Sequence, residues 1–384
     1  MMRKIAIVAA PLFLLMVLET AFRLGIWEPL AASRSHAATS IRMKRALLDP
    51  ALARIDFVTL GSSRPQFGID HARLADAAAA QGFVHANLSM PGSHWMTIGV
   101  VSRWLQAHHP EIQGGLIALS AQDLTWKTNG YYELGIVQPF RRGAHGAWIE
   151  ARNPFDSTRI ESYGSRSALF AWRDDVRDFL THPFSRIANL RNTPDAPDTP
   201  ALFRNQELTG DMCQWGVQSL DACSRLDSAA NGPPRLRQQC GKIREHVGNL
   251  PDYPSLIGKE ELPLYMQETR DLAQSQLRAL DWPVSPIVVL MPMPKIWRDD
   301  TRSVLAQEWA LRILRPLDDE GVIHLLDATR FFDDAGSDAC TYFADFYHQN
   351  AKGRERLSRW LLPQVGDMLF GPRASVRPIA RAEK

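Results

Sequence analysis

Short apolar segments rich in β-branched residues alternate with longer segments of helical period in two parts of this chain, and this alternation constrains the fold most. Strands are predicted at residues 55–60, 84–90, 116–120, 287–291 and 322–326. Helices are predicted at residues 69–81, 95–107, 263–280, 303–317 and 352–368. Strands that alternate with helices form a parallel sheet covered by helices on both faces. The sequence therefore predicts a three-layer α/β fold.

The alternation stops between residues 126 and 261, where polar residues, Gly, Pro and several aromatic residues are mixed without a clear period. A structureless loop of that length is improbable inside a compact domain. We therefore expect an insertion subdomain or lid at 126–261, between a first part of the core at 51–125 and a second part at 262–370. A linker at 28–50 precedes the core, and a basic tail at 371–384 follows it.

The first 27 residues carry a targeting signal. Arg3 and Lys4 precede about fourteen mostly apolar residues, the length of a signal-peptide core and short for a full membrane span. Glu19 and Arg23 are four residues apart and can pair on a helix, and the apolar stretch then resumes as far as Trp27. A single uncleaved anchor is favoured over a cleaved signal peptide, and both place the body of the protein outside the cytoplasm. A cytoplasmic amphipathic helix is the third and least favoured alternative.

Charge and cysteine content bound the class of protein further. The 44 basic and 42 acidic residues nearly cancel, so no nucleic-acid partner is expected. Of the four cysteines, Cys213, Cys223 and Cys240 lie close together in the sequence and Cys340 stands apart. The sequence contains no CxxC pair, which is the spacing that would suggest a metal site. In an oxidising compartment two disulfides are expected, with three possible pairings, of which Cys213 with Cys223 is the most local. Buried free thiols are the alternative, and a redox or metal protein is a further one.

Polar residues follow three of the predicted strands. The first strand ends in Gly61-Ser62-Ser63, which can present a serine on a tight turn. The segment that ends in Gly92 offers a backbone N–H for a developing oxyanion, and Gln122 offers a side-chain amide after the third strand. Because ligands bind at the carboxyl ends of strands in open α/β sheets, we expect these groups to share one site.

An acid–base pair is predicted just before the last helix. Asp345 and His348 are three residues apart, which would place both side chains on one side of a helical turn. The histidine can take the proton of a serine while the aspartate fixes its tautomer. The resulting hypothesis is a serine nucleophile at Ser63 with Asp345 and His348, and an oxyanion site formed by Ser63, Gly92 and Gln122. No cofactor or metal is predicted.

The order of these motifs resembles the SGNH (GDSL-type) hydrolases. Ser63 matches the nucleophile of block I, Gly92 the block II glycine, and Asp345 with His348 the pair of block V. Block III departs from the family pattern, because Gln122-Asp123 replaces Asn-Asp, and Ser62 replaces the usual block I aspartate. The resemblance covers about 55–125 and 285–368, and it implies a flavodoxin-like sheet order.

Within that superfamily, the N-terminal anchor and the Gly-Ser-Ser block I look like the DltD-like group. This resemblance implies O-acyl transfer to a cell-surface polysaccharide or polymer, or the reverse deacylation, together with a multi-span membrane O-acyltransferase. The substrates would be an acyl donor and a polysaccharide or polyol acceptor. The alternative from a different class is a non-catalytic binding or scaffold protein on a degenerate SGNH fold, which the block III departure favours.

Overall fold

The computed structural model describes residues 2–31, 36–49, 54–124, 136–140, 167–191, 205, 207–217, 219–228, 234–248 and 264–371. These residues divide between two compact units. The smaller unit takes its residues from Met1–Leu52, Gly99–Trp104 and Lys127–Thr199. The larger takes them from Ala53–Ile98, Leu105–Trp126 and Pro200–Lys384.

A parallel sheet forms the centre of the larger unit. Among the described residues it has five strands in the order β2-β1-β3-β4-β5, which is the order of flavodoxin-like doubly wound sheets. The strands are β1 (Phe57–Gly61), β2 (His85–Asn87), β3 (Gly114–Leu119), β4 (Ile287–Leu290) and β5 (His324–Asp327). Each pairs in parallel with its neighbours, with Phe57 opposite His85 on one side and Gly114 on the other. The predicted α/β class and parallel sheet are confirmed.

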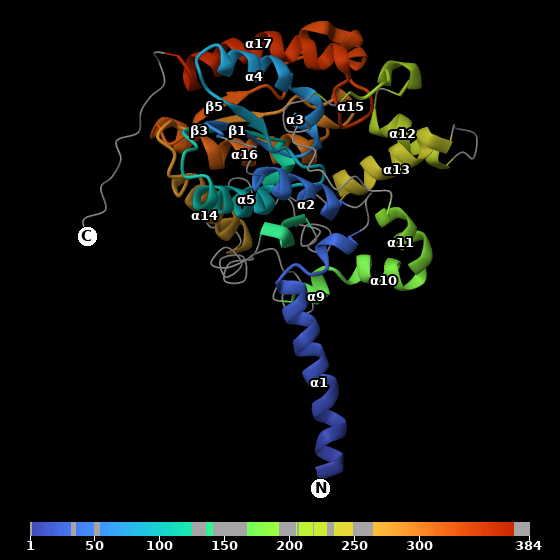
Figure 1. The fold of residues 1–384 in the computed structure, drawn as a ribbon. Coiled ribbons are helices and arrows are strands. Elements are labelled where there is room, and N and C mark those ends of the chain that lie inside the picture. Colours follow the sequence, from blue (N-terminus) through green and yellow to red (C-terminus); the bar gives the residue numbers. More distant parts are fainter. Residues whose placement is uncertain are drawn as a thin grey trace. The chain divides into compact units, whose positions relative to one another are not determined.

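Helices cover both faces of this sheet, which gives three layers. Figure 1 shows α4 with α17 over one face and α14 with α16 over the other. Because both faces are covered, β1, β3 and β4 are buried along their whole length, as parallel strands require, whereas the edge strand β5 is partly exposed. The helices of the larger unit longer than one or two turns are α4 (His71–Ala79), α5 (Trp95–His108, shared with the smaller unit), α12 (Leu220–Ser228), α13 (Pro234–Gly248), α14 (Leu264–Arg278), α16 (Thr301–Asp319) and α17 (Ala351–Leu369).

Shorter helices follow the ends of β1, β3, β4 and β5, and a further one precedes α12. They are α3 (Ser63–Gly68), η2 (Ala121–Leu124), η5 (Met212–Trp215), α15 (Lys295–Arg298) and η7 (Asp333–Tyr342). The helix predicted at 69–81 corresponds to α4, which begins two residues later because Asp70 caps it by accepting a hydrogen bond from the Arg73 N–H. A side-chain cap of this kind satisfies an N–H that has no acceptor within the helix.

Helix α17 shows why its sequence packs on the sheet. Leu357, Leu361, Val365 and Leu369 recur every fourth residue, are all buried, and belong to the same apolar core as Phe57 of β1. A stripe with this spacing lies on one face of an α-helix, so its burial holds α17 against the sheet. Asp70 is tied to the same helix, because its N–H donates to Ser358 Oγ over 2.9 Å.

The smaller unit is helical in its described part. It contains α1 (Met2–Arg23), η1 (Glu28–Leu30), α2 (His36–Leu47), η3 (Gln138–Phe140), α9 (Ala168–Ala171), α10 (Arg173–Thr181) and α11 (Pro183–Arg191). Phe22, Ile41 and Trp172 share its apolar core. Glu19 accepts hydrogen bonds from Ser167 Oγ and from the N–H groups of Ala168 and Leu169, which joins the end of α1 to α9.

The N-terminal segment forms a single long helix, α1, and the Glu19–Arg23 pair expected on it is present, with Arg23 Nε 2.7 Å from Glu19 Oε1. The apolar side chains of residues 12–18 on this helix are exposed. Across the described part of the chain, no helix meets the length and hydropathy required to cross a membrane.

All four cysteines are described, and they form two disulfides, as expected. The most local pairing was wrong, because Cys213 pairs with Cys340 and Cys223 with Cys240. Cys223 lies on α12 and Cys240 on α13, and these two helices pack against each other with both sulfur atoms buried. Cys213 lies on η5, which contacts η7 and so faces Cys340 instead. Two disulfides are typical of a protein from an oxidising extracellular or periplasmic compartment.

Part of the predicted organisation lies outside the described residues. This holds for the basic tail beyond residue 371 and, within the predicted insertion, for 126–135, 141–166, 192–204, 206, 218, 229–233 and 249–261. The described residues of 126–261 are divided, since 136–140 and 167–191 belong to the smaller unit whereas η5, α12 and α13 belong to the larger one. In the larger unit, Met212, Val217, Cys223 and Ile243 join the main core beside the sheet.

Candidate active site

Ser63 is placed by the end of β1, the central strand of the predicted first part of the core. The strand ends at Gly61, Ser62 follows it, and Ser63 begins α3. A Cβ atom on Gly61 would lie 2.5 Å from the Ala118 carbonyl oxygen and 2.4 Å from Pro65 Cγ. Glycine is therefore required by the close approach of α3 to β3. Ser62 caps the helix, since its Oγ accepts a long hydrogen bond from the Arg64 N–H, at 3.4 Å.

Asp345 and His348 lie on a tight loop, so the expected helical turn was wrong. An antiparallel bridge between Phe343 and Gln349 closes the loop, and the Ala344 N–H donates to the His348 carbonyl over 2.9 Å. Asp345 Oδ1 accepts from the N–H groups of Tyr347, at 2.7 Å, and of His348, at 2.9 Å. An aspartate commonly bonds backbone N–H groups in this way in turns, which makes the non-helical conformation favourable.

The structure brings these residues together with Ser63 in one chain of hydrogen bonds. His348 Nε2 lies 2.8 Å from Ser63 Oγ, and His348 Nδ1 lies 3.0 Å from each carboxylate oxygen of Asp345. Because a carboxylate only accepts hydrogen bonds, Nδ1 carries a proton, and Nε2 of the neutral ring is then free to accept the serine proton. Both side chains of the Asp345–His348 pair are 20% exposed, so the pair remains open to solvent on one side.

Two opposing effects act on the pKa of Asp345. Burial raises it, whereas the hydrogen bond and charge of His348 and the N–H groups of Tyr347 and His348 lower it. The second set is stronger, so the pKa of this carboxyl lies below its usual range. Asp345 is therefore ionised at neutral pH and stabilises positive charge on His348.

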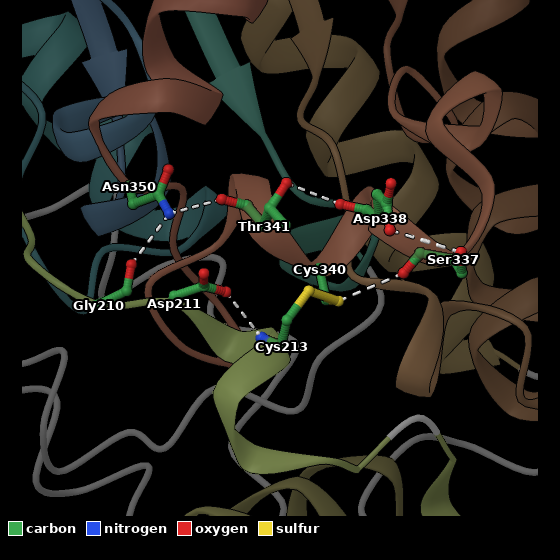
Figure 2. The surroundings of a disulfide bond; sticks show 8 residues. All are labelled: Gly210, Asp211, Cys213, Ser337, Asp338, Cys340, Thr341 and Asn350. Atoms are coloured by element: carbon green, nitrogen blue, oxygen red, sulfur yellow. Dashed lines mark hydrogen bonds between the residues drawn. A yellow bond between two sulfur atoms is a disulfide. The ribbon is translucent and has the colours of Figure 1, made fainter.

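Four hydrogen bonds hold the Asp345–His348 loop in place. Trp297 Nε1 donates to the Phe346 carbonyl over 2.7 Å. Asn350 caps α17 through the Gly353 N–H, and its Nδ2 donates to the Gly210 and Thr341 carbonyls. Figure 2 shows these last contacts beside the Cys213–Cys340 disulfide, which joins the same two segments covalently. Because the loop is fixed at both ends, its histidine is held toward Ser63.

Gly92 lies in a reverse turn that is attached to the end of β1. The Met90 carbonyl accepts from the Ser93 N–H over 3.1 Å, and Gly92 has a φ of 77°. Proline followed by a glycine of positive φ is the pattern of a type II turn, which explains why Pro91 precedes Gly92. The Met90 N–H donates to the Gly61 carbonyl over 2.9 Å, which ties the turn to the residues just before Ser63.

Gln122 is fully buried, with its side-chain amide already in contact with other groups. Its Oε1 accepts from Arg64 Nη1 at 3.4 Å, and its Nε2 lies 3.7 Å from Met293 Sδ. These contacts give Gln122 a structural position beside Arg64, so its predicted part in an oxyanion site stays a prediction.

Arg64, Asp123 and His94 form a neighbouring set of charged and polar groups, in which Arg64 and Asp123 are buried and His94 is partly buried. His94 Nδ1 lies 3.4 Å from Asp123 Oδ1, and the other carboxylate oxygen of Asp123 accepts from the Ser120 N–H over 2.7 Å. Burial raises the pKa of Asp123, but the hydrogen bond and charge of His94 and the charge of Arg64 lower it below its usual range. The sequence indicated these three residues only through the many polar residues that follow β1, β2 and β3.

Two stacked histidines lie behind the nucleophile. His85 Nε2 is 2.9 Å from Thr59 Oγ1 on β1, and His71 Nε2 is 2.9 Å from the Pro65 carbonyl on α3. Their rings are nearly parallel, 6.2 Å apart, and both are completely buried. Burial lowers the pKa of His71 to about 4 and that of His85 to about 3, so both are neutral at pH 7. They support β1 and α3 as neutral packing groups.

Neither a scan of protein-family models nor a search of the curated proteins found a match to this chain.

Proposed function

We propose that this protein is an extracytoplasmic serine-dependent acyl-ester enzyme of the SGNH type. The observation that carries the proposal is the hydrogen-bonded chain from Ser63 Oγ through His348 to the Asp345 carboxylate. A serine, a histidine base and an orienting carboxylate in this geometry are the parts that nucleophilic acyl transfer requires. The strand order β2-β1-β3-β4-β5, with Ser63 just after β1, supports the SGNH-like part of the proposal.

In the proposed reaction, Ser63 Oγ attacks the carbonyl carbon of an ester or thioester while His348 Nε2 takes its proton. The bond to the leaving group then breaks, and His348 returns the proton to the leaving atom. The N–H of Ser63 is at the first position of α3, where no intrahelical acceptor exists, and the N–H of Gly92 lies in the neighbouring turn. These two groups would stabilise the oxyanion, and the loss of one such donor typically costs about 3–4 kcal/mol of barrier.

The second half of the reaction decides the class of the enzyme. If water attacks the acyl-serine the protein is an esterase, and if a sugar or polyol hydroxyl attacks it the protein is an O-acyltransferase. We propose transfer to a cell-surface polysaccharide or polymer, as in the DltD-like group, with a multi-span membrane O-acyltransferase as partner. The reverse deacylation uses the same residues.

The compartment follows from the two disulfides, which indicate an oxidising extracellular or periplasmic environment. We propose in addition that α1 anchors the protein in the membrane. The exposed apolar side chains at residues 12–18 and the Glu19–Arg23 pair at its end support this part of the proposal. Alkaline extraction of membranes tests it, since an anchored protein stays in the pellet and a merely adsorbed one is released.

Covalent labelling with a fluorophosphonate tests the nucleophile. The wild-type ectodomain is expected to be labelled, and Ser63→Ala is expected to abolish the labelling. Ser62→Ala is the matched control, because the two serines are adjacent but only Ser63 Oγ is hydrogen-bonded to His348. Labelling that is absent from the wild type, or that persists in Ser63→Ala, would refute the catalytic proposal and favour a binding protein on the same fold.

A further inference from the structure

Arg64 follows Ser63 directly in the chain, and it is buried although most arginines lie on the protein surface. Its side chain is only 6% exposed. The guanidinium carbon lies 5.1 Å from the ring centre of Trp297, which is itself fully buried. Because the same Trp297 donates to the Phe346 carbonyl, the Arg64 side chain connects α3, on which it lies, to the tryptophan that holds the His348 loop. A cation over an aromatic face in a desolvated position is held firmly.

The guanidinium has more donors than acceptors around it. Its hydrogen bond to Gln122 Oε1 is long, at 3.4 Å, and is the one side-chain hydrogen bond that Arg64 makes within the described part of the chain. In that same part, no carboxylate comes close enough to form an ion pair with it. The remaining donors are not among the enclosed, unsatisfied polar atoms of the interior, so they keep access to solvent. An arginine carries five N–H donors, so several of them can bind a ligand.

The positive charge of Arg64 is likewise not neutralised by a directly paired carboxylate in the described part of the chain. Burial lowers the pKa of Arg64, and the charges of Asp123 and Asp345 raise it from a longer range. Arginine nevertheless stays protonated in proteins, so this position holds a permanent and partly desolvated cation. Burial of a cation without a directly paired anion is unfavourable. A ligand with negatively charged oxygens would supply the missing partner.

We propose that Arg64 binds an anionic oxygen group of the substrate, a carboxylate or a phosphate, while Ser63 attacks the ester carbonyl. The inference rests on the proposed function, and it deepens that function by naming the substrate class. The planar fork of a guanidinium matches the two oxygens of a carboxylate or phosphate. Ser63 and Arg64 are consecutive residues of α3, so the anionic group and the reacting carbonyl would belong to one substrate molecule. Arg64 forms no covalent bond and acts by binding.

Matched esters test the proposal. On the acyl side, 4-nitrophenyl hemisuccinate is compared with neutral 4-nitrophenyl butyrate, and on the leaving-group side 4-carboxyphenyl acetate is compared with phenyl acetate. We expect the wild type to prefer one anionic ester by roughly tenfold or more in kcat/KM, the size of a charge-assisted hydrogen bond. Competition by inorganic phosphate or by acetate against phenyl acetate distinguishes phosphate from carboxylate recognition.

Variants locate the preference. Arg64→Gln is expected to abolish the preference for the anionic ester, and Arg64→Lys to retain part of it, since lysine keeps the charge but lacks the fork. Arg298→Gln is the control, because Arg298 is equally buried but already paired with Asp299 and Asp333. It should keep the wild-type preference. Fluorophosphonate labelling of each variant shows that the fold and the nucleophile are intact.

Two results would overturn the assignment of Arg64. One is a wild type that hydrolyses neutral and anionic esters equally, and the other is a preference that survives in Arg64→Gln. If instead the proposed function is wrong, neutral-ester hydrolysis and fluorophosphonate labelling will not depend on Ser63.

Discussion

The two disulfides should contribute unequally to stability and to activity, and the chain allows each to be removed separately. Cys213 and Cys340 are 127 residues apart in sequence, whereas Cys223 and Cys240 are 17 apart. In the chain-entropy model, loops of these lengths correspond to about 5 and about 3 kcal/mol of stability, respectively. The first value is a large fraction of the roughly 5–15 kcal/mol that stabilises an ordinary domain. The Cys213→Ala/Cys340→Ala variant should therefore unfold at a much lower urea concentration than Cys223→Ala/Cys240→Ala.

Activity should separate the two variants further. The long bridge lies next to the contacts of Asn350 with Gly210 and Thr341, and the Met212 N–H donates to the Phe343 carbonyl over 3.0 Å at the start of the Asp345–His348 loop. Its removal should lower kcat for a neutral ester even at a temperature where the protein is fully folded. The short bridge joins α12 to α13, so its removal should lower stability and leave kcat close to that of the wild type.

The measurements are urea unfolding followed by circular dichroism, and steady-state hydrolysis of phenyl acetate at 15 °C. If the Cys223→Ala/Cys240→Ala variant were the less stable of the two, the argument from loop length would be refuted. If Cys213→Ala/Cys340→Ala kept the wild-type kcat while folded, the bridge would have no part in positioning His348.

Three other changes have expected outcomes. Asp345→Asn should lower kcat by roughly a thousandfold or more in a protein that remains folded, because the neutral amide no longer holds the His348 tautomer. An unchanged rate would exclude Asp345 from the triad. His71 and His85 have folded-state pKa values of about 4 and about 3, below the unfolded value of about 6.5. The unfolded chain therefore takes up protons first, so stability is highest above about pH 6.5 and falls as the pH drops toward 4. The loss is about 2 kcal/mol per histidine at pH 5. Urea midpoints measured from pH 8 to pH 4 check this, and a His71→Gln/His85→Gln variant should show a flatter profile. Gly61→Ala should destabilise the protein by roughly 2 kcal/mol or more, because the added methyl group meets the Ala118 carbonyl oxygen, and calorimetry would show it as a lower Tm.

The sheet could be predicted from sequence because each of its elements has a local pattern. The β-branched run before Gly61 and the fourfold spacing of apolar residues from Leu357 to Leu369 are properties of short segments, and both appear in the structure with shifts of one or two residues at their ends. The meeting of Ser63 with His348 was also within reach, because strand ends and the segments after them gather at one edge of a parallel sheet.

Other features depend on contacts between segments that are distant in sequence. The spacing of Asp345 and His348 fits a helical turn, but the Asp345 carboxylate instead binds the N–H groups of Tyr347 and His348, and the Phe343–Gln349 bridge closes a loop. The burial of Arg64 depends on Trp297, more than 200 positions away in the chain, so no local pattern announces it. The disulfide pairing depends in the same way on which helices pack together.

The distance along the chain between the two halves of the site has a consequence for biosynthesis. Ser63 and His348 are 285 positions apart, and β4, β5 and Cys340 also come late in the chain. A nascent polypeptide that has emerged only as far as its middle therefore contains Ser63 but not His348, and neither cysteine of the long disulfide. The hydrogen-bonded chain from Ser63 to Asp345 can form only after nearly the whole polypeptide has been synthesised.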